Sequence, residues 1–157
     1  MFKMSKPYKF LIGTSLPEFS LENESGDYIS NDNLIGKWSV LFFYPKDHSP
    51  GCTLQSCHFR NNYEYFHENE ILLYGISTDS IESHKNFKQK HGLQFSLLSD
   101  KGAKFIKKLK LKKIFNFIRP RVTMIIDPKG IIRHVHSSQM NMKGHIHKTI
   151  KAFAKLK

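Results

Sequence analysis

Apolar residues gather in three runs along the chain, broken inside a run only by Gly75 and Thr123, and polar residues close or follow each run. The runs lie in residues 40–44, 71–77 and 122–127. Continuous apolar runs of this length, without polar alternation, are typical of strands that are buried on both faces of a sheet. We therefore predict three central strands over these residues.

Between the runs, apolar residues recur at the spacing of a helix. Phe59, Tyr63 and Phe66 predict one helix from Pro50 to about His67, with its apolar face on the core. Similar patterns predict three more helices, over residues 80–91 with Gly92 closing the end, over 102–109, and over 142–156.

Shorter segments complete the pattern. Residues 17–21 and 28–30 predict an N-terminal hairpin, and residues 131–136 predict a hairpin partner for the third central strand. We expect a single helical turn at 31–36, a short strand at 95–98 and a loose lead-in over residues 1–16. The alternation of strands and helices predicts an α/β sandwich around a central sheet. The length of 157 residues fits one domain, residues 1–157, and there is no repeat or linker.

Composition and charge narrow the range of partners. The formal net charge is +12, from 25 Lys and Arg against 13 Asp and Glu. Such a charge admits nucleic acid or acidic surfaces as partners, but no aromatic–basic signature accompanies it, and we do not expect nucleic acid. No apolar stretch approaches the roughly 20 residues that span a bilayer, so we expect no membrane partner. The first residues lack the apolar core of a secretory signal, and we expect a cytoplasmic protein.

Both cysteines of the chain follow the first central strand. Pro50-Gly51-Cys52 opens the predicted helix, and Cys57 follows within it. The free N–H groups and the dipole of a helix N-terminus favour a thiolate, which is the nucleophilic form of cysteine. A structural thiol fits Cys57 better than Cys52. A zinc site with His48 and His58 would have poor geometry and lacks the usual CxxC motif, and a thioredoxin-type pair would need CxxC. A reactive thiol with a nearby partner thiol remains.

The residues around Cys52 resemble a known family. Pro45, Ser49 and Cys52 have the spacing of the peroxiredoxin signature, and Cys57 lies where the Q-type group has its second cysteine. Further matches are FFYPKD, PGCT, GISTD, LLSD and the segment RVTMIIDPKG. The chain thus resembles the Q-type peroxiredoxins, also called bacterioferritin comigratory proteins, from about Phe19 to Lys155. This resemblance implies a thioredoxin-like three-layer sandwich with a mixed central sheet.

The resemblance also implies a mechanism. Cys52 attacks the peroxide, Arg121 stabilises the charge, Ser49 orients the peroxide oxygens and Pro45 shields the sulfur. The resulting sulfenic acid then forms a disulfide with Cys57, which thioredoxin or a similar dithiol reduces. The implied enzyme is a monomer and needs no metal or organic cofactor. The rival hypothesis is a basic nucleic-acid or protein interaction module on the same scaffold, with redox-sensing cysteines.

The spacing of the two cysteines makes a further prediction. On one regular helix, five residues correspond to ~7.5 Å of rise and ~140° of rotation, whereas a disulfide joins Cα atoms roughly 4.4–6.8 Å apart. We therefore expect the helix to unwind locally before Cys52 and Cys57 can bond.

Gln55 stands where many relatives have Glu, which removes a negative charge near the site. We expect Arg60 to be structural, the nine histidines to be surface residues, and the lysines of 107–113 to form a solvated helix face.

Overall fold

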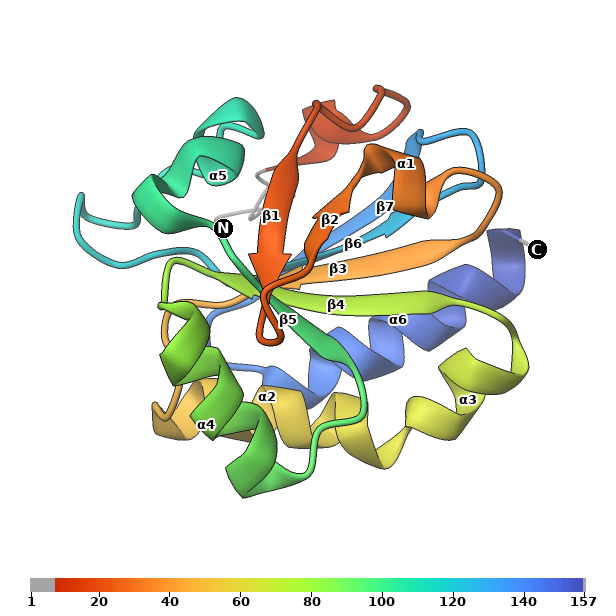
Figure 1. Cartoon of the computed structure of the whole chain (residues 1–157). Helices are drawn as coiled ribbons and strands as arrows, with labels where there is room; N and C mark the ends of the chain where they lie inside the picture. The colour runs from red at the N-terminus through yellow and green to blue at the C-terminus, as the bar shows by residue number, and fades with distance from the viewer. Residues whose placement is uncertain (1–7, 157) are drawn as a thin grey trace.

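The computed structural model describes residues 8–156 of the chain. Its centre is one seven-stranded sheet with the order β2-β1-β5-β4-β3-β6-β7 (Figure 1). The strands are β1 (Ser20–Asn23), β2 (Tyr28–Ser30), β3 (Ser39–Phe43), β4 (Leu72–Ser77), β5 (Ser96–Ser99), β6 (Val122–Ile126) and β7 (Ile132–Ser137). The helical elements are η1 (Lys9–Leu11), α1 (Asn31–Leu34), α2 (Pro50–Asn61), α3 (Tyr63–Glu68), α4 (Ile81–His91), η2 (Lys101–Ala103), α5 (Lys104–Lys108) and α6 (Met142–Leu156).

The sheet is mixed, as predicted. Strands β3, β4 and β5 run parallel, and β6 pairs antiparallel with β3. The N-terminal hairpin joins the sheet because β1 pairs antiparallel with β5. The α/β class, the central mixed sheet and the N-terminal hairpin are thereby confirmed. No helix among residues 8–156 is long and apolar enough to cross a membrane.

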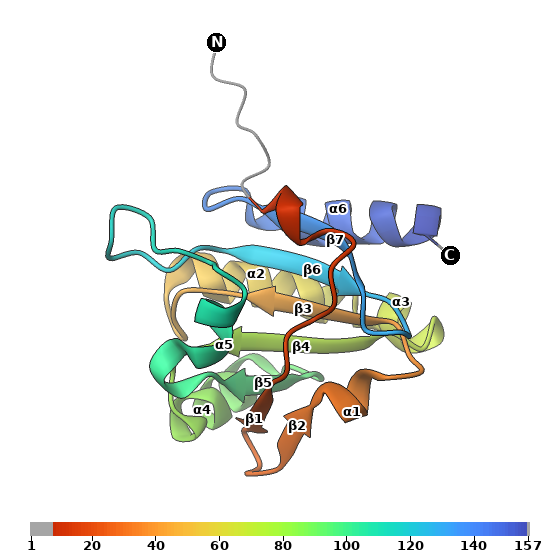
Figure 2. The ribbon, with the colours of Figure 1, turned by 90° about the horizontal axis from the view of Figure 1, so that it is seen from above.

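Alternate side chains of β3 point to two separate cores. Val40, Phe42 and Tyr44 pack under α2, α3, α4 and α6, while Leu41 and Phe43 pack toward α5 and the N-terminal segment. Figures 1 and 2 show the four longer helices on one face of the sheet and the shorter elements on the other. All five residues of β3 are buried, which explains why its sequence shows no polar alternation.

Several element boundaries differ from the prediction. The helix expected over residues 50–67 is interrupted at Asn62, whose side-chain amide donates to the carbonyl oxygen of His58 at 2.8 Å. In a regular helix that carbonyl would accept from the backbone N–H of Asn62, which here donates to the Phe59 carbonyl oxygen at 3.2 Å. The side-chain amide thus replaces the helical bond where α2 ends and α3 begins. The first strand lies at Ser20–Asn23, later than expected. The described part of the lead-in is ordered: Leu11 and Leu16 are buried, and Ser15 bridges to Ile131.

The turn between β5 and α5 also departs from the regular helix expected from Gly102. Gly102 and Ala103 both have positive φ, at 78° and 57°. The chain therefore bends sharply before α5 begins at Lys104. Asp100 supports this bend, because its carboxylate accepts from the backbone N–H groups of Phe105 and Ile106 at 3.1 and 2.9 Å.

Candidate active site

The site lies where β3 ends and α2 begins. The parallel strands β3 and β4 end at the same edge of the sheet, which is where open α/β sheets place their sites. Pro50 occupies the first turn of α2, where a missing N–H is harmless, and the N–H of Thr53 donates to the Ser49 carbonyl oxygen at 2.9 Å. The result is a helix whose first turn carries Cys52, as the sequence predicts.

Two donors point at the sulfur of Cys52. The Nη1 of Arg121 lies 3.2 Å from Sγ, and the backbone N–H of Lys46 donates to Sγ at 3.5 Å. The side chain of Cys52 is fully buried. A guanidinium, a backbone N–H and a helix N-terminus all stabilise a negatively charged sulfur. The structure thus brings together Cys52 and Arg121, which are 69 residues apart in the sequence.

Arg121 is held in place from several sides. Its Nη1 donates to the side-chain oxygen of Gln55 at 2.7 Å, its Nε donates to the Gln139 carbonyl oxygen at 3.4 Å, and its backbone N–H donates to the Gln139 side chain. The Arg121 side chain is buried. Because Gln55 is a neutral amide, this contact fixes the guanidinium without placing a carboxylate beside it.

The approach of Arg121 to the helix depends on Gly51. A Cβ atom at this position would lie 3.0 Å from Nη2 of Arg121 and 2.7 Å from Cε of Met142. Real side chains essentially never tolerate the shorter contact, so Met142 or Arg121 would have to move. The glycine of the PGCT segment therefore leaves the space in which the guanidinium reaches the sulfur.

The other predicted site residues lie around the turn before α2. Ser49 is half-buried, and its hydroxyl donates to the Lys46 carbonyl oxygen at 2.9 Å. Pro45 is half-buried directly after the buried Tyr44. The hydrogen bonds to the Cys52 sulfur come from Arg121 and Lys46, whereas the Ser49 hydroxyl is bonded to the Lys46 carbonyl oxygen, so Ser49 borders the site.

Cys57 lies on the same helix but in a different environment. It is half-buried, and both cysteines are free thiols. Helix α2 continues unbroken from Pro50 to Asn61. Both cysteines therefore lie on one regular helix, as predicted, with about 7.5 Å of rise between them.

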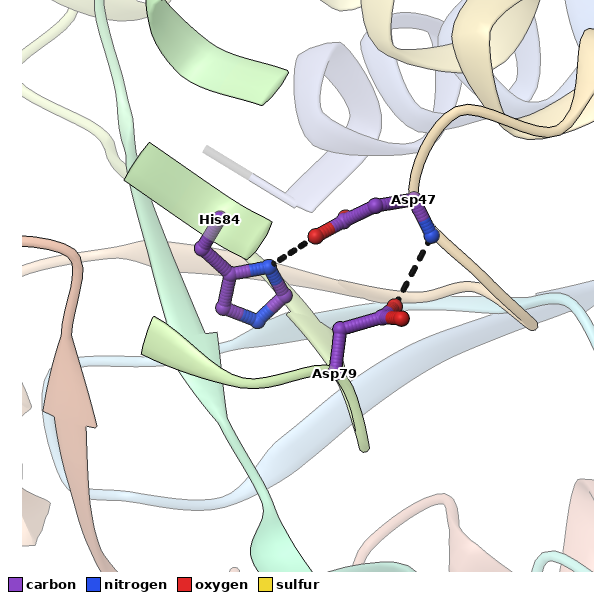
Figure 3. Close-up of side chains that lie close together, drawn as sticks. All are labelled: Asp47, Asp79 and His84. Atoms are coloured by element: carbon purple, nitrogen blue, oxygen red, sulfur yellow. Dashed lines mark hydrogen bonds and ion pairs between the residues drawn. The ribbon is translucent and has the colours of Figure 1, made fainter. Parts of the chain in front are cut away.

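A buried network anchors the turn that precedes Cys52 (Figure 3). The carboxylate of Asp47 lies 2.6 Å from Nδ1 of His84 and accepts from the Tyr44 hydroxyl at 2.6 Å and the Ser83 hydroxyl at 2.9 Å. The other ring nitrogen of His84 faces the Leu98 carbonyl oxygen at 3.0 Å. Burial and the nearby Asp47 carboxylate raise the pKa of Tyr44 well above its usual value, so its hydroxyl remains a donor.

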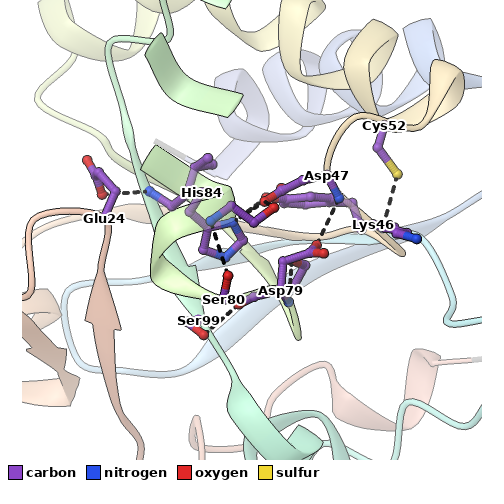
Figure 4. A network of polar contacts seen from close by, with 12 residues as sticks. Glu24, Lys46, Asp47, Cys52, Asp79, Ser80, His84 and Ser99 are labelled. Carbon is purple, nitrogen blue, oxygen red and sulfur yellow. Dashed lines mark hydrogen bonds and ion pairs between the residues drawn. The ribbon is translucent and has the colours of Figure 1, made fainter. Parts of the chain in front are cut away.

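Asp79 ties the same turn to the end of β4 (Figure 4). Its carboxylate accepts from the backbone N–H of Asp47 at 2.8 Å and from the Ser77 hydroxyl at 2.6 Å. Its carbonyl oxygen accepts from the Ser99 hydroxyl at 2.6 Å. The turn that presents the Lys46 N–H to the sulfur is thus fixed to β4, β5 and α4.

Asp47, Asp79 and His84 also form a group of potential metal ligands, with donor atoms within 4.8 Å of one another. Both ring nitrogens of His84 already face oxygen partners, the Asp47 carboxylate at 2.6 Å and the Leu98 carbonyl oxygen at 3.0 Å. A histidine must present a deprotonated nitrogen to bind a metal. The bonding pattern therefore fits a hydrogen-bonded anchor rather than a metal centre.

A second buried histidine lies behind Arg121. Nε2 of His145 donates to the Ser138 carbonyl oxygen at 2.8 Å, and Nδ1 accepts from the Thr123 hydroxyl at 2.8 Å. Burial lowers the pKa of His145 to about 4, and the charges of His136 and Arg121 act in the same direction. The expectation that the histidines are surface residues is therefore wrong for His145 and for His84, which are fully buried.

Sequence reasoning missed the anchoring residues Asp47, Asp79, His84 and Gln139. Asp47 lies in FFYPKD and Asp79 in GISTD, but neither motif by itself shows that these carboxylates fix the turn before Cys52. Arg60 has the structural role that we predicted, because its guanidinium donates to the His91 carbonyl oxygen at 2.8 Å. His48 lies in the turn with a φ of 64° and packs against Phe87, with ring centroids 5.2 Å apart.

Comparison with known proteins gives a consistent result. Residues 12–135 match the AhpC/TSA family. The chain is 39% identical over 146 residues to the chloroplastic peroxiredoxin Q of Sedum lineare, which covers 92% of this chain and 78% of that protein. It is 37% identical over 142 residues to the putative peroxiredoxin bcp of Coxiella burnetii, covering 86% and 93% of the two chains.

Solved structures agree with the sequence relatives. Peroxidoxin BcpB from Mycobacterium tuberculosis superposes with a TM-score of 0.85 at 28% identity, covering 93% of this chain and 97% of that one. A peroxiredoxin Q mutant from Xanthomonas campestris gives a TM-score of 0.83 at 27% identity, with 88% and 92% covered. With the fold and the buried cysteine described above, these matches show that the chain belongs to the AhpC/TSA family, among the Q-type peroxiredoxins or bacterioferritin comigratory proteins.

Proposed function

We propose that this peroxiredoxin reduces hydrogen peroxide and organic hydroperoxides with Cys52 as the attacking residue. The observation that carries the proposal is the buried Cys52 sulfur with Arg121 Nη1 at 3.2 Å. The Cys52 thiolate attacks the terminal oxygen of the peroxide, and the O–O bond breaks. The leaving oxygen takes up a proton and departs as water or an alcohol, while the sulfur is oxidised to a sulfenic acid.

The residues around the sulfur have separate proposed roles. Arg121 stabilises the thiolate and the negative charge that develops on the leaving oxygen. Ser49 borders the site and orients the peroxide with its hydroxyl, while Pro45 shields the sulfur from bulk water. The exposed side of the Ser49 hydroxyl supports its role, because a single bond to the Lys46 carbonyl uses only its proton.

Cys57 is the proposed resolving residue. Its thiol attacks the Cys52 sulfenic acid, a disulfide forms and water leaves. Because α2 is regular from Pro50 to Asn61, the first turns of the helix unwind before the sulfurs meet. The unwound segment exposes the disulfide to thioredoxin or a similar dithiol, which reduces it.

The proposed reaction needs no organic cofactor and no second subunit. Cys52, Arg121 and Cys57 all come from one chain, which supports a monomer as the working unit. A thiol that is reduced again after each turnover suits a compartment that keeps thiols reduced, so we place the activity in the cytoplasm. Organic substrates are supported by a relative: the bacterioferritin comigratory protein of Xanthomonas campestris, 26% identical, is described for alkyl peroxide reduction activity.

The proposal is tested by coupling the purified protein to thioredoxin, thioredoxin reductase and NADPH with hydrogen peroxide as substrate. We expect Cys52→Ser to abolish NADPH consumption. Cys57→Ser should keep one stoichiometric turnover but lose recycling by thioredoxin. Unchanged turnover in Cys52→Ser would rule out the mechanism, and full recycling in Cys57→Ser would rule out the resolving role.

A further inference from the structure

The segment from η2 through α5 to the start of β6 is rich in basic residues that the proposed reaction does not use. Between Asp100 and Asp127 the sequence has no acidic residue, while it has seven lysines and two arginines: Lys101, Lys104, Lys107, Lys108, Lys110, Lys112, Lys113, Arg119 and Arg121. Apart from Arg121, none of them serves the proposed reaction. The lysines Lys107, Lys110, Lys112 and Lys113 are exposed.

The same segment exposes large apolar side chains. We call residues 110–119 the Lys–Phe loop. Phe115 is 80% exposed and Phe117 is 71% exposed, and only Met140, at 87%, exceeds them among the exposed large apolar side chains of the described residues. Figure 2 shows the Lys–Phe loop projecting away from the body of the molecule. Within residues 8–156, most of the surface of these two phenylalanine side chains is therefore left uncovered.

The exposure of these phenylalanines is built into the backbone. Ile114 and Ile118 bridge, with the Ile114 N–H donating to the Ile118 carbonyl oxygen at 2.7 Å, so the chain turns tightly between them. Phe115 and Asn116 both have positive φ, at 51° and 65°. A positive φ is common for asparagine in such turns but unfavourable for a bulky residue. The turn holds an aromatic ring outward at a position where a small polar residue would be easier to accommodate.

The Lys–Phe loop is joined to the rim of the proposed active site. The Gln139 side chain donates to the Arg119 carbonyl oxygen at 3.4 Å, and Met140 follows directly with its exposed side chain. Phe117 precedes Arg121 by four residues, so their Cα atoms lie within about 14 Å. Exposed apolar side chains, Phe117 and Met140, therefore lie on two segments that also hold Arg121 or its partner Gln139.

We propose that the Lys–Phe loop docks this protein onto an anionic phospholipid surface. Phe115 and Phe117 enter the boundary between headgroups and acyl chains, and the lysines beside them meet the lipid phosphates. An apolar tip with flanking cations is suited to the membrane interface and needs no spanning segment. A nucleic-acid site would instead line a basic groove with aromatic rings, whereas this tip stands out from the surface. We expected no membrane partner from the sequence because no apolar stretch is long enough to span a bilayer. Docking at the membrane surface does not need such a stretch.

Docking in this orientation also points to a substrate class, and this step rests on the proposed function. With the loop in the interface, the Cα atom of Arg121 lies within about 14 Å of that of the inserted Phe117, and Arg121 contacts the Cys52 sulfur. Hydroperoxides of phospholipid acyl chains, whose oxidised segments are polar, are then substrates at the membrane surface. The reaction is the one proposed above, with the acyl hydroperoxide reduced to the acyl alcohol.

Binding is tested by sedimentation with vesicles of phosphatidylcholine alone and vesicles with one third phosphatidylglycerol. We expect the full-length protein to bind the anionic vesicles, with salt weakening the binding. Lys112→Gln together with Lys113→Gln should weaken it by about fivefold per lysine, and Phe115→Ser together with Phe117→Ser by at least about tenfold. The matched controls are Lys85→Gln with Lys90→Gln on α4, and Tyr28→Ser on the hairpin, which replace exposed residues far from the loop in sequence.

All these variants should keep the hydrogen peroxide rate of the wild type, because none of the changed residues touches the Cys52 sulfur. Equal binding to both vesicle types, or unchanged binding of the phenylalanine variant, would overturn the docking proposal. So would preferential binding of an anionic oligonucleotide that the phenylalanine variant retains. The substrate step predicts that the phenylalanine variant loses activity on vesicle-borne phospholipid hydroperoxide only. If the wild type does not reduce hydrogen peroxide, the proposed function is wrong, while the sedimentation experiment still tests the docking proposal.

Discussion

The two cysteines share helix α2 but differ in almost everything else. Cys52 is fully buried, receives two hydrogen bonds at its sulfur and lies beside a turn that is fixed by Asp47 and His84. Cys57 is half-buried, and within residues 8–156 no hydrogen bond reaches its sulfur. The chain thus surrounds the first thiol with hydrogen-bond donors and leaves the second partly exposed on the same helix. That difference suits an attacking residue and a resolving residue on one helix.

Removing the anchor of the Cys52 turn should have the largest effect. In His84→Leu, the Asp47 carboxylate stays buried without its histidine, and breaking a buried ion pair in this way costs about 3–5 kcal/mol. We expect a fall of that size in the free energy of unfolding, measured with urea, and slower peroxide reduction because the Lys46 N–H loses its position. His48→Gln in the same turn, at an exposed residue, is the matched control. Wild-type stability in His84→Leu would show that the network does not anchor the turn.

Removing the guanidinium should reduce the difference between the two thiols directly. In Arg121→Gln the Cys52 sulfur loses its charged donor, and loss of one such donor typically slows a reaction by about 100-fold. We expect that decrease in the rate of sulfenic acid formation. We also expect a smaller ratio of the iodoacetamide labelling rate of Cys52 to that of Cys57 at pH 7. The control Arg60→Gln changes an arginine on α2, the helix that carries both cysteines. It should leave the rate of sulfenic acid formation and the labelling ratio unaffected. Equal peroxide rates in Arg121→Gln and wild type would contradict the assigned role.

Acid should lower the free energy of unfolding through protonation of His145. Burial lowers the pKa of His145 to about 4, while an unfolded histidine titrates near 6.5. The unfolded state therefore binds more protons between these values, and stability falls as the pH falls. Between pH 7 and pH 5 this effect amounts to about 2 kcal/mol. The slope should disappear in His145→Gln and persist in His147→Gln, two residues along α6, when unfolding free energy is measured at several pH values. A slope that survives in His145→Gln would assign the effect to other groups.

The fold was largely predictable because its main signals are local. A few consecutive residues are enough to predict the strands β3, β4 and β6, from their apolar runs, and the start of α2, from Pro-Gly-Cys. The break at Asn62 was not predictable from periodicity, since the apolar spacing of Phe59, Tyr63 and Phe66 continues across it. There a single side-chain amide decides the boundary.

The site was only partly predictable for a related reason. Arg121 and Cys52 were expected together because the resemblance supplied the pairing, which no local pattern gives across 69 residues. The pair of Asp47 and His84 spans 37 residues without such guidance, and an aspartate in a turn is usually exposed. Only the packing of α4 against the Cys52 turn shows that both are buried.

The proposed mechanism requires helix α2 to hold Cys52 in place in the reduced state and to unwind before Cys57 can reach it. Amide hydrogen exchange over residues 50–61, compared between the reduced protein and the Cys52–Cys57 disulfide form, tests this claim most directly. We predict strong protection in the reduced form and loss of protection in the first turns of α2 after oxidation, with β3 and β6 unchanged in both. Equal protection of residues 50–61 in the two forms would contradict the account.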